Sequence, residues 1–157
     1  MKIPARLSVL CKSDRGASLI ELALVCPLLF LLLFGAIDFG RAYYVYLELT
    51  SAAHAGAEYG SLYPSDSTGI VAAASQSAPN VPNLNVLTPV WGCECSDGTS
   101  YSASCTTAPT CSANSTRGSN LVYRVQVTTS AVYTTVIPWK AIPASFTLST
   151  TATIRGN

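Results

Sequence analysis

Residues 14–41 read DRGASLIELALVCPLLFLLLFGAIDFGR, and this stretch decides the fold. Its central part, Ala17–Ile37, runs for 21 residues with Glu21 as the only charged side chain. As a helix it would span about 31 Å, close to the thickness of the hydrocarbon core of a bilayer. Leu28–Phe34 is apolar on every side, and the chain is too short to build a large protein core around such a helix. We therefore predict a transmembrane helix over about residues 19–38.

The composition narrows the class of protein. Of the 157 residues, 49% are hydrophobic and only 11% are charged, which excludes a disordered polar chain. The net charge of +1, without a clustered basic face, gives no support for binding to nucleic acid.

The charges that precede the apolar run set the expected orientation. Residues 1–16 carry four basic side chains and one acidic side chain, which are Lys2, Arg6, Lys12, Arg15 and Asp14. By the positive-inside rule this segment stays in the cytoplasm, and the chain beyond Asp38 lies on the other side of the membrane. A cleavable secretory signal is the alternative, but residues 35–41 do not offer the cleavage pattern that such a signal needs.

Glu21 is not explained by a plain membrane anchor, because a carboxylate in hydrocarbon is costly unless it is paired. If the peptide bond after Gly16 is cut, Ala17 becomes the first residue and Glu21 the fifth. The new α-amino group, in the same copy or a neighbouring one, is then a cation that can pair with this acid. An acid near the start of a helix also complements the helix dipole. The alternative is that Glu21 lies near the membrane surface and reaches water.

This arrangement resembles the N-terminus of type IV prepilins, which have a short basic leader, a glycine, a glutamate at mature position five and an apolar helix. More narrowly, Arg15–Leu29 and Gly35–Arg41 resemble the TadE-like family of pseudopilins from tight-adherence (Flp-type) pilus systems. The glutamate, proline, glycine and acidic residue of the family pattern correspond to Glu21, Pro27, Gly35 and Asp38.

The resemblance implies a non-enzymatic protein of the bacterial inner membrane that takes part in the assembly or structure of such a pilus, and hence in cell adhesion. It implies cleavage between Gly16 and Ala17 by a prepilin peptidase, with Glu21 and Pro27 as the helix-assembly residues. The implied partners are the membrane, the peptidase, other pilin or pseudopilin subunits and the pilus assembly machinery. Ala17 stands where prepilins usually have phenylalanine or methionine, which argues against a conventional major pilin, and Glu58 stands where the family usually has arginine.

The helix is expected to continue past the membrane to about Leu62, because no proline interrupts the chain between Pro27 and Pro64. Small residues recur along it at a spacing of four, at Ala36, Gly40, Ala52, Gly56 and Gly60. Such a face allows close approach of another element. We expect a sheet to pack on the small residues at 52–60 and a partner helix on those at 36–40.

The far end of the chain shows the period-two alternation of half-buried strands. We expect four strands and one short helix, at Leu121–Thr128, Phe146–Ile154, Ala131–Ile137, Val86–Trp91 and Thr68–Gln76. Short links between consecutive strands favour an antiparallel meander. The predicted fold is α+β, with a small antiparallel β-sheet domain packed on the extramembrane half of a long N-terminal helix. The predicted organisation is a leader at 1–16, the helix at 17–62 and an extracytoplasmic domain at 63–157.

Four of the six cysteines lie on the predicted outer side, at Cys93, Cys95, Cys105 and Cys111. Disulfides persist on that side of the membrane, so we expect two bridges that staple the polar loop 93–111. Nested pairing, Cys93–Cys111 with Cys95–Cys105, suits a hairpin-like loop and is preferred over the crossed form. A zinc site is disfavoured because the spacing is irregular. Cys11 and Cys26 are expected to stay unpaired.

The sequence offers no constellation that would support catalysis, and we expect no metal or cofactor. His54 and Glu58 share a helix face at a spacing of four, but two possible ligands do not make a metal site. No phosphate-binding loop, nucleophile elbow or carboxylate cluster is present. The alternative function is that of an uncleaved single-pass membrane protein that presents a disulfide-stapled extracellular binding domain.

Overall fold

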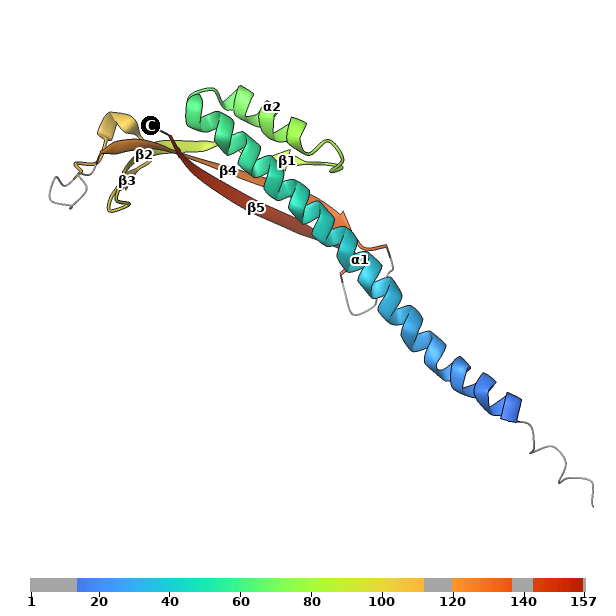
Figure 1. Cartoon of the computed structure of the whole chain (residues 1–157). Helices are drawn as coiled ribbons and strands as arrows, with labels where there is room; N and C mark the ends of the chain where they lie inside the picture. The colour runs from blue at the N-terminus through green and yellow to red at the C-terminus, as the bar shows by residue number, and fades with distance from the viewer. Residues whose placement is uncertain (1–13, 112–119, 137–142, 157) are drawn as a thin grey trace, which may run out of the picture. The chain divides into compact units, whose positions relative to one another are not determined.

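The computed structural model describes residues 14–111, 120–136 and 143–156 (Figure 1). Most of the predicted leader and the predicted strand end at Ile137 lie outside the described residues. The chain divides into two compact units, Met1–Gly40 and Arg41–Asn157.

Helix α1 runs from Asp14 to Leu62 as one continuous element of 49 residues, with Pro27 inside it (Figure 1). It begins three residues before Ala17, which is the predicted start. It ends two residues before Pro64, which is the terminator that the sequence predicts.

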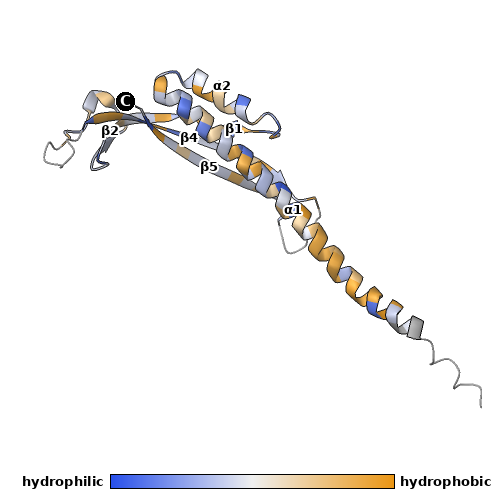
Figure 2. Cartoon of the chain, in the orientation of Figure 1, coloured by the Kyte–Doolittle hydropathy of each residue, from blue (hydrophilic) through white to orange (hydrophobic). Residues whose placement is uncertain are grey.

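The first unit contains only the N-terminal part of α1 among its described residues. Every side chain described between Gly16 and Phe39 is exposed, apart from Cys26 and Asp38, which are partly buried. In Figure 2 most of this part of the helix has the orange colour of hydrophobic residues. Within the described chain, α1 is the one helix that is long and apolar enough to cross a membrane.

The second unit contains a five-stranded antiparallel sheet built around one long strand, β4 (Leu121–Thr134). The other strands are β1 (Asn85–Val86), β2 (Val90–Cys95), β3 (Tyr101–Ser102) and β5 (Ser145–Gly156). β5 pairs with one edge of β4 along its whole length, from Tyr123↔Gly156 to Thr134↔Ser145. The other edge of β4 pairs with β2 and β1, and β3 pairs with β2. β5 pairs with no strand other than β4 among the described residues, so it is an edge strand.

Three details of the predicted sheet are wrong. Ala131–Thr134 is not a separate strand, because the alternation of buried and exposed residues continues through Thr129 and Ser130 and makes β4 one element. Val86–Trp91 is divided between β1 and β2, with Pro89 between them. The sheet is also not a simple meander, because β1 and β2 do not pair with each other and both pair with the later strand β4.

A short helix, α2 (Ser67–Ser77), follows α1 and matches the predicted Thr68–Gln76 closely. Asp66 caps it by accepting a 2.9 Å hydrogen bond from the Gly69 backbone N–H. The Tyr59 hydroxyl donates a second 2.9 Å bond to the same carboxylate. These two hydrogen bonds lower the pKa of Asp66 below its usual range, and the bond from Gly69 has the larger effect. The hydrogen bond to the Asp66 carboxylate raises the pKa of Tyr59.

The core of the second unit lies between the C-terminal part of α1, helix α2 and β4. Ala52, Ala53, Gly56, Ala57 and Gly60 of α1 are all buried. A Cβ atom at Gly60 would lie 2.7 Å from Val125 Cγ1, so only glycine allows this approach of helix and sheet. The sheet therefore packs on the small residues at 52–60, as the sequence predicts. The buried Thr129 hydroxyl donates a hydrogen bond to the Leu49 carbonyl at 2.9 Å.

Candidate functional site

The predicted processing region lies in the first turn of α1. Gly16 is helical and exposed, and a Cβ atom placed on it would meet no described atom within 4 Å. The first amides of a helix have no partner in the preceding turn, so this turn unwinds more easily than any turn behind it. The described residues therefore leave the Gly16 side of the Gly16–Ala17 peptide bond accessible to an enzyme.

Glu21 and Pro27 both lie on the exposed N-terminal part of α1. Glu21 is exposed and has no ion-pair partner among the described residues. It follows Ala17 by four residues, so in a helix that starts at Ala17 the carboxylate and the new terminus lie on the same side. Such a helix can associate with other helices through its apolar surface, with one negative charge near its beginning.

The four predicted cysteines form two disulfides, but in the crossed arrangement. Cys93 pairs with Cys105 and Cys95 with Cys111, with Cα–Cα distances of 5.1 and 5.5 Å. The preferred nested pairing is therefore wrong. Cys93 and Cys95 lie two residues apart on one face of β2, where both are buried. The 3₁₀ turn Cys105–Thr107 returns the chain first to Cys93, which leaves Cys95 for Cys111. Cys26 is a free cysteine, as predicted.

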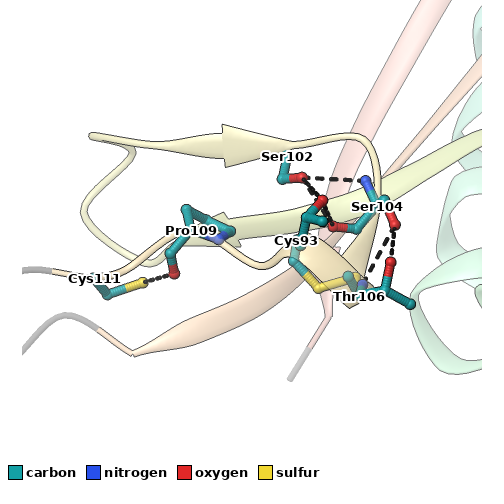
Figure 3. The surroundings of a disulfide bond; sticks show 8 residues. Cys93, Ser102, Ser104, Thr106, Pro109 and Cys111 are labelled. Atoms are coloured by element: carbon teal, nitrogen blue, oxygen red, sulfur yellow. Dashed lines mark hydrogen bonds between the residues drawn. A yellow bond between two sulfur atoms is a disulfide. The ribbon is translucent and has the colours of Figure 1, made fainter.

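Figure 3 shows the environment of the Cys93 disulfide. Hydroxyl groups hold the segment that follows β3: Ser102 donates to the Ser104 carbonyl at 2.8 Å, and Ser104 and Thr106 share a 2.6 Å hydrogen bond. This segment has few apolar side chains to bury, so the two bridges fix it chiefly by restricting the unfolded chain.

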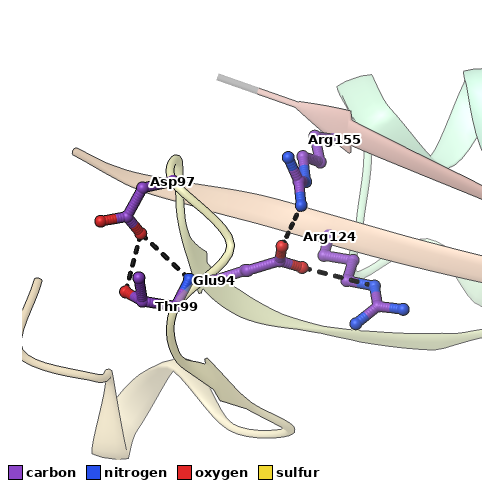
Figure 4. Close-up of polar contacts among 5 residues, drawn as sticks. All are labelled: Glu94, Asp97, Thr99, Arg124 and Arg155. Atoms are coloured by element: carbon purple, nitrogen blue, oxygen red, sulfur yellow. Dashed lines mark hydrogen bonds and ion pairs between the residues drawn. The ribbon is translucent and has the colours of Figure 1, made fainter. Parts of the chain in front are cut away.

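The sequence analysis does not predict the ion pairs of Glu94 (Figure 4). Glu94 lies between the two bridged cysteines of β2 and is paired with two arginines from other strands. The Glu94 side chain is only 5% exposed and lies 3.4 Å from the Arg124 Nε of β4. It also forms an ion pair with Arg155 of β5. The Arg124 guanidinium lies in turn 5.0 Å from the centre of the Tyr101 ring. This cluster joins three strands and neutralises a buried acid, which is a structural role.

One signal in the sequence points to this cluster. Glu94 stands between Cys93 and Cys95, so in a strand its side chain lies on the opposite face from the two half-cystines. The partners of Glu94 come from two distant strands, so their identity follows only from the strand register.

The described residues contain no group of three or more side chains that could hold a metal ion. His54 and Glu58 both lie exposed on α1. Asp97 serves a local turn, in which it accepts hydrogen bonds from the Thr99 backbone N–H at 3.1 Å and from the Thr99 hydroxyl at 2.7 Å.

Residues 16–58 match a protein-family model described as TadE-like protein. The match confirms the resemblance predicted from the N-terminal sequence, and it covers both the exposed and the buried parts of α1. Comparisons with curated proteins and with solved structures found no match. The match covers only the N-terminal part of the 157-residue chain, within α1, which is the one helix of the described chain that is long and apolar enough to cross a membrane.

Proposed function

From the TadE-like segment at residues 16–58, we propose that the chain is a pseudopilin or minor pilin that takes part in the assembly or structure of a tight-adherence (Flp-type) pilus. One observation carries the proposal. Gly16, Glu21 and Pro27 lie at the family spacing on the N-terminal part of α1, where almost every described side chain is exposed. A helix of this kind requires either lipid or other helices around it, and a pilus assembly supplies both in turn.

The proposed topology follows from the charge distribution. The basic leader, residues 1–16, is on the cytoplasmic side, α1 crosses the inner membrane, and residues 63–157 form an extracytoplasmic domain. The two disulfides are consistent with this orientation, because bridges persist outside the reducing cytoplasm.

The proposed role of Glu21 depends on processing by a prepilin peptidase. Cleavage after Gly16 creates a positive α-amino group on Ala17, four residues from the Glu21 carboxylate. In a low-dielectric membrane this cation and the acid of a neighbouring subunit attract strongly, and any misalignment along the helix axis separates them. The pair therefore favours one axial offset between neighbouring helices. Pro27 has no backbone N–H to donate. It therefore leaves a carbonyl of the preceding helical turn without its usual hydrogen bond.

The position of the cleavage site supports processing before assembly. Peptidases act on extended chain, and the bond after Gly16 lies in the first helical turn, where unwinding breaks few hydrogen bonds. At Gly16, no described atom lies within 4 Å of where a Cβ atom would be.

The test is the N-terminus of the protein in membranes from cells that contain or lack the prepilin peptidase. We expect intact-mass spectrometry to find Ala17 first when the peptidase is present, and the leader retained when it is deleted. A Gly16→Leu variant should retain the leader in both strains, whereas Gly40→Leu should be cleaved normally. A wild-type chain that keeps residues 1–16 alongside an active peptidase would contradict the proposal and favour an uncleaved membrane protein that presents a binding domain.

A further inference from the structure

The free edge of β5 differs from the other borders of the sheet in its length. β5, dark red in Figure 1, spans 12 residues and pairs with β4 without a bulge. The other two strands with a single partner, β1 and β3, have two residues each. Among the described residues no strand pairs with the second side of β5. Natural sheets usually shorten or cover their edges, so a long open edge within the second unit is unusual.

The direction of the backbone groups shows which residues of β5 face this free edge. The Leu87 N–H, which follows β1, donates to the Thr128 carbonyl at 2.9 Å, so that carbonyl points away from β5. Backbone groups of successive residues alternate in direction, so Thr129 points toward β5, where it pairs with Thr150. The Ser149 hydroxyl donates to the Thr129 carbonyl at 3.2 Å, in agreement with this assignment.

Alternate residues of β5 therefore direct their N–H and C=O groups away from β4. The pairing has no bulge, so the same alternation holds along the whole strand. The residues concerned are Ser145, Thr147, Ser149, Thr151, Thr153 and Arg155, and all of their side chains are exposed. No described turn or loop forms a backbone hydrogen bond with them. Water or another extended strand can satisfy a regular row of this kind.

The side chains of β5 indicate what kind of strand fits. On the face toward α1, Leu148 and Ile154 are partly buried and Ala152 is buried against the core. Phe146 on the same face is 37% exposed. The opposite face carries hydroxyl groups and Arg155. A strand with apolar side chains at alternate positions would extend the apolar row and cover Phe146, and such cross-strand pairs stabilise a sheet.

A second copy does not fit this edge under the proposed topology. Residues 41–62 of α1 run against β4 and therefore along β5, because Leu49 contacts Thr129 and Gly60 lies against Val125. Antiparallel pairing of two β5 strands would direct these helical segments oppositely, whereas all copies of a membrane protein share one orientation. Parallel pairing would turn one sheet over, so that the apolar row of one copy would meet the hydroxyl groups of the other.

We propose that the free edge of β5 is a docking site for an extended strand of a different protein, which joins the sheet by β-augmentation. The partner segment has apolar side chains at alternate positions, and its backbone binds the outward N–H and C=O groups of β5. The inference rests on the proposed function only where the orientation in the membrane excludes a second copy. Its test measures strand pairing and does not depend on cleavage of the leader, so the two can fail separately.

The experiment adds a synthetic strand to the full-length protein in detergent. The probe is a fluorescein-labelled peptide with the sequence of Tyr123–Thr134, which alternates in the required way and pairs with β5 within the fold. Fluorescence anisotropy measures binding, and amide hydrogen exchange locates it. On binding we expect exchange at Ser149 and Thr151 to slow at least about tenfold, with no change at Thr150, whose N–H is directed to β4.

Two substitutions at one position form the matched pair. Thr153→Pro removes an outward N–H but no bond to β4, and proline is tolerated on edge strands. We expect it to weaken peptide binding at least about tenfold, because one hydrogen bond is lost and the ring obstructs the incoming strand. Thr153→Ala keeps the N–H and should bind as the wild type does. Intact disulfides and an unchanged near-ultraviolet circular dichroism spectrum show that each variant is folded.

Equal binding by Thr153→Pro and the wild type would overturn the inference, because the peptide would then not use the free edge. Absence of peptide binding to the wild type would overturn it as well. Slow exchange of the Thr151 amide before the peptide is added would show that the edge is already covered, and dependence of this protection on protein concentration would assign the edge to a second copy. None of these results bears on cleavage after Gly16, which tests the proposed function.

Discussion

The two parts of α1 are one helix made for two different surroundings. Between Gly16 and Gly40 most side chains are large, apolar and exposed among the described residues. Between Leu49 and Gly60 the face toward the sheet is alanine and glycine, and it is buried. The two parts of α1 are both apolar but differ in side-chain size. Side-chain size is therefore the better indicator of what each part of the helix packs against. Small residues allow close contact within one chain, and large ones cover a helix that meets lipid or other subunits.

The sharpest test of this contrast places the same side chain in each part. Gly60→Val puts a branched side chain where even a Cβ atom would lie 2.7 Å from Val125 and 3.0 Å from Ile70. We expect the free energy of unfolding of the second unit to fall by roughly 1–3 kcal/mol. Near-ultraviolet circular dichroism during denaturant unfolding, in detergent, measures it. Gly40→Val has the same effect on helix propensity but meets nothing within 4 Å, so it should leave unfolding almost unchanged. Equal losses for both variants would show that propensity, and not packing, separates the two parts.

Two glutamates extend the comparison to charge. Glu94 is buried and paired with two arginines of its own chain. Glu94→Gln removes this charge from between two arginines that remain partly exposed, and we expect a loss of about 1–2 kcal/mol in unfolding free energy.

Glu21→Gln should not alter unfolding of the second unit, because Glu21 has no ion-pair partner among the described residues. It should instead reduce pilus assembly, scored by surface pili, while membrane insertion persists. Normal piliation would favour the uncleaved binding protein over the pseudopilin.

The smallest expected effect concerns the cap of α2. Bonds from Gly69 and Tyr59 lower the pKa of Asp66 below its ordinary value of 3.8. A carboxyl whose pKa is lowered by folding stabilises the native state above its unfolded pKa, and this stabilisation is lost as the pH falls through the folded pKa. We therefore expect hydrogen exchange of the α2 amides to accelerate in acid. Asp66→Asn keeps a capping oxygen that does not titrate, so its exchange, corrected for intrinsic rates, should lack this acid step. Retention of the step in that variant would assign it to another group.

The sequence predicts the parts of the molecule that are governed by local pattern. The apolar run from Leu22 to Ile37, the proline at Pro64 and the spacing of small residues identify α1, its end and its buried face. The alternation in Leu121–Thr128 and Phe146–Ile154 identifies the two long strands. Each of these signals depends on neighbours within a few residues, for which helix and strand periods are fixed.

The features that the sequence does not reveal depend on which distant segments meet. The crossed disulfides follow from the path of the chain through Cys105–Thr107, and spacing alone allows three pairings. The pairing of β1 and β2 with β4, and not with each other, depends on long-range contacts. The ion pairs of Glu94 need the register of β2, β4 and β5 together. A single sequence contains no direct record of such contacts.

The edge position of β5 has a practical consequence. Its free side presents backbone donors and acceptors along 12 residues, and Arg155 is its only charge. Proteins usually protect edge strands with lysine, proline or a β-bulge. An unprotected edge strand can pair with strands of other molecules, and this pairing leads to aggregation. A fragment that is overproduced without its lipid and its neighbours therefore has a built-in tendency to precipitate. A lysine introduced in the middle of the border, as in Thr151→Lys, is the substitution that should keep such a preparation in solution.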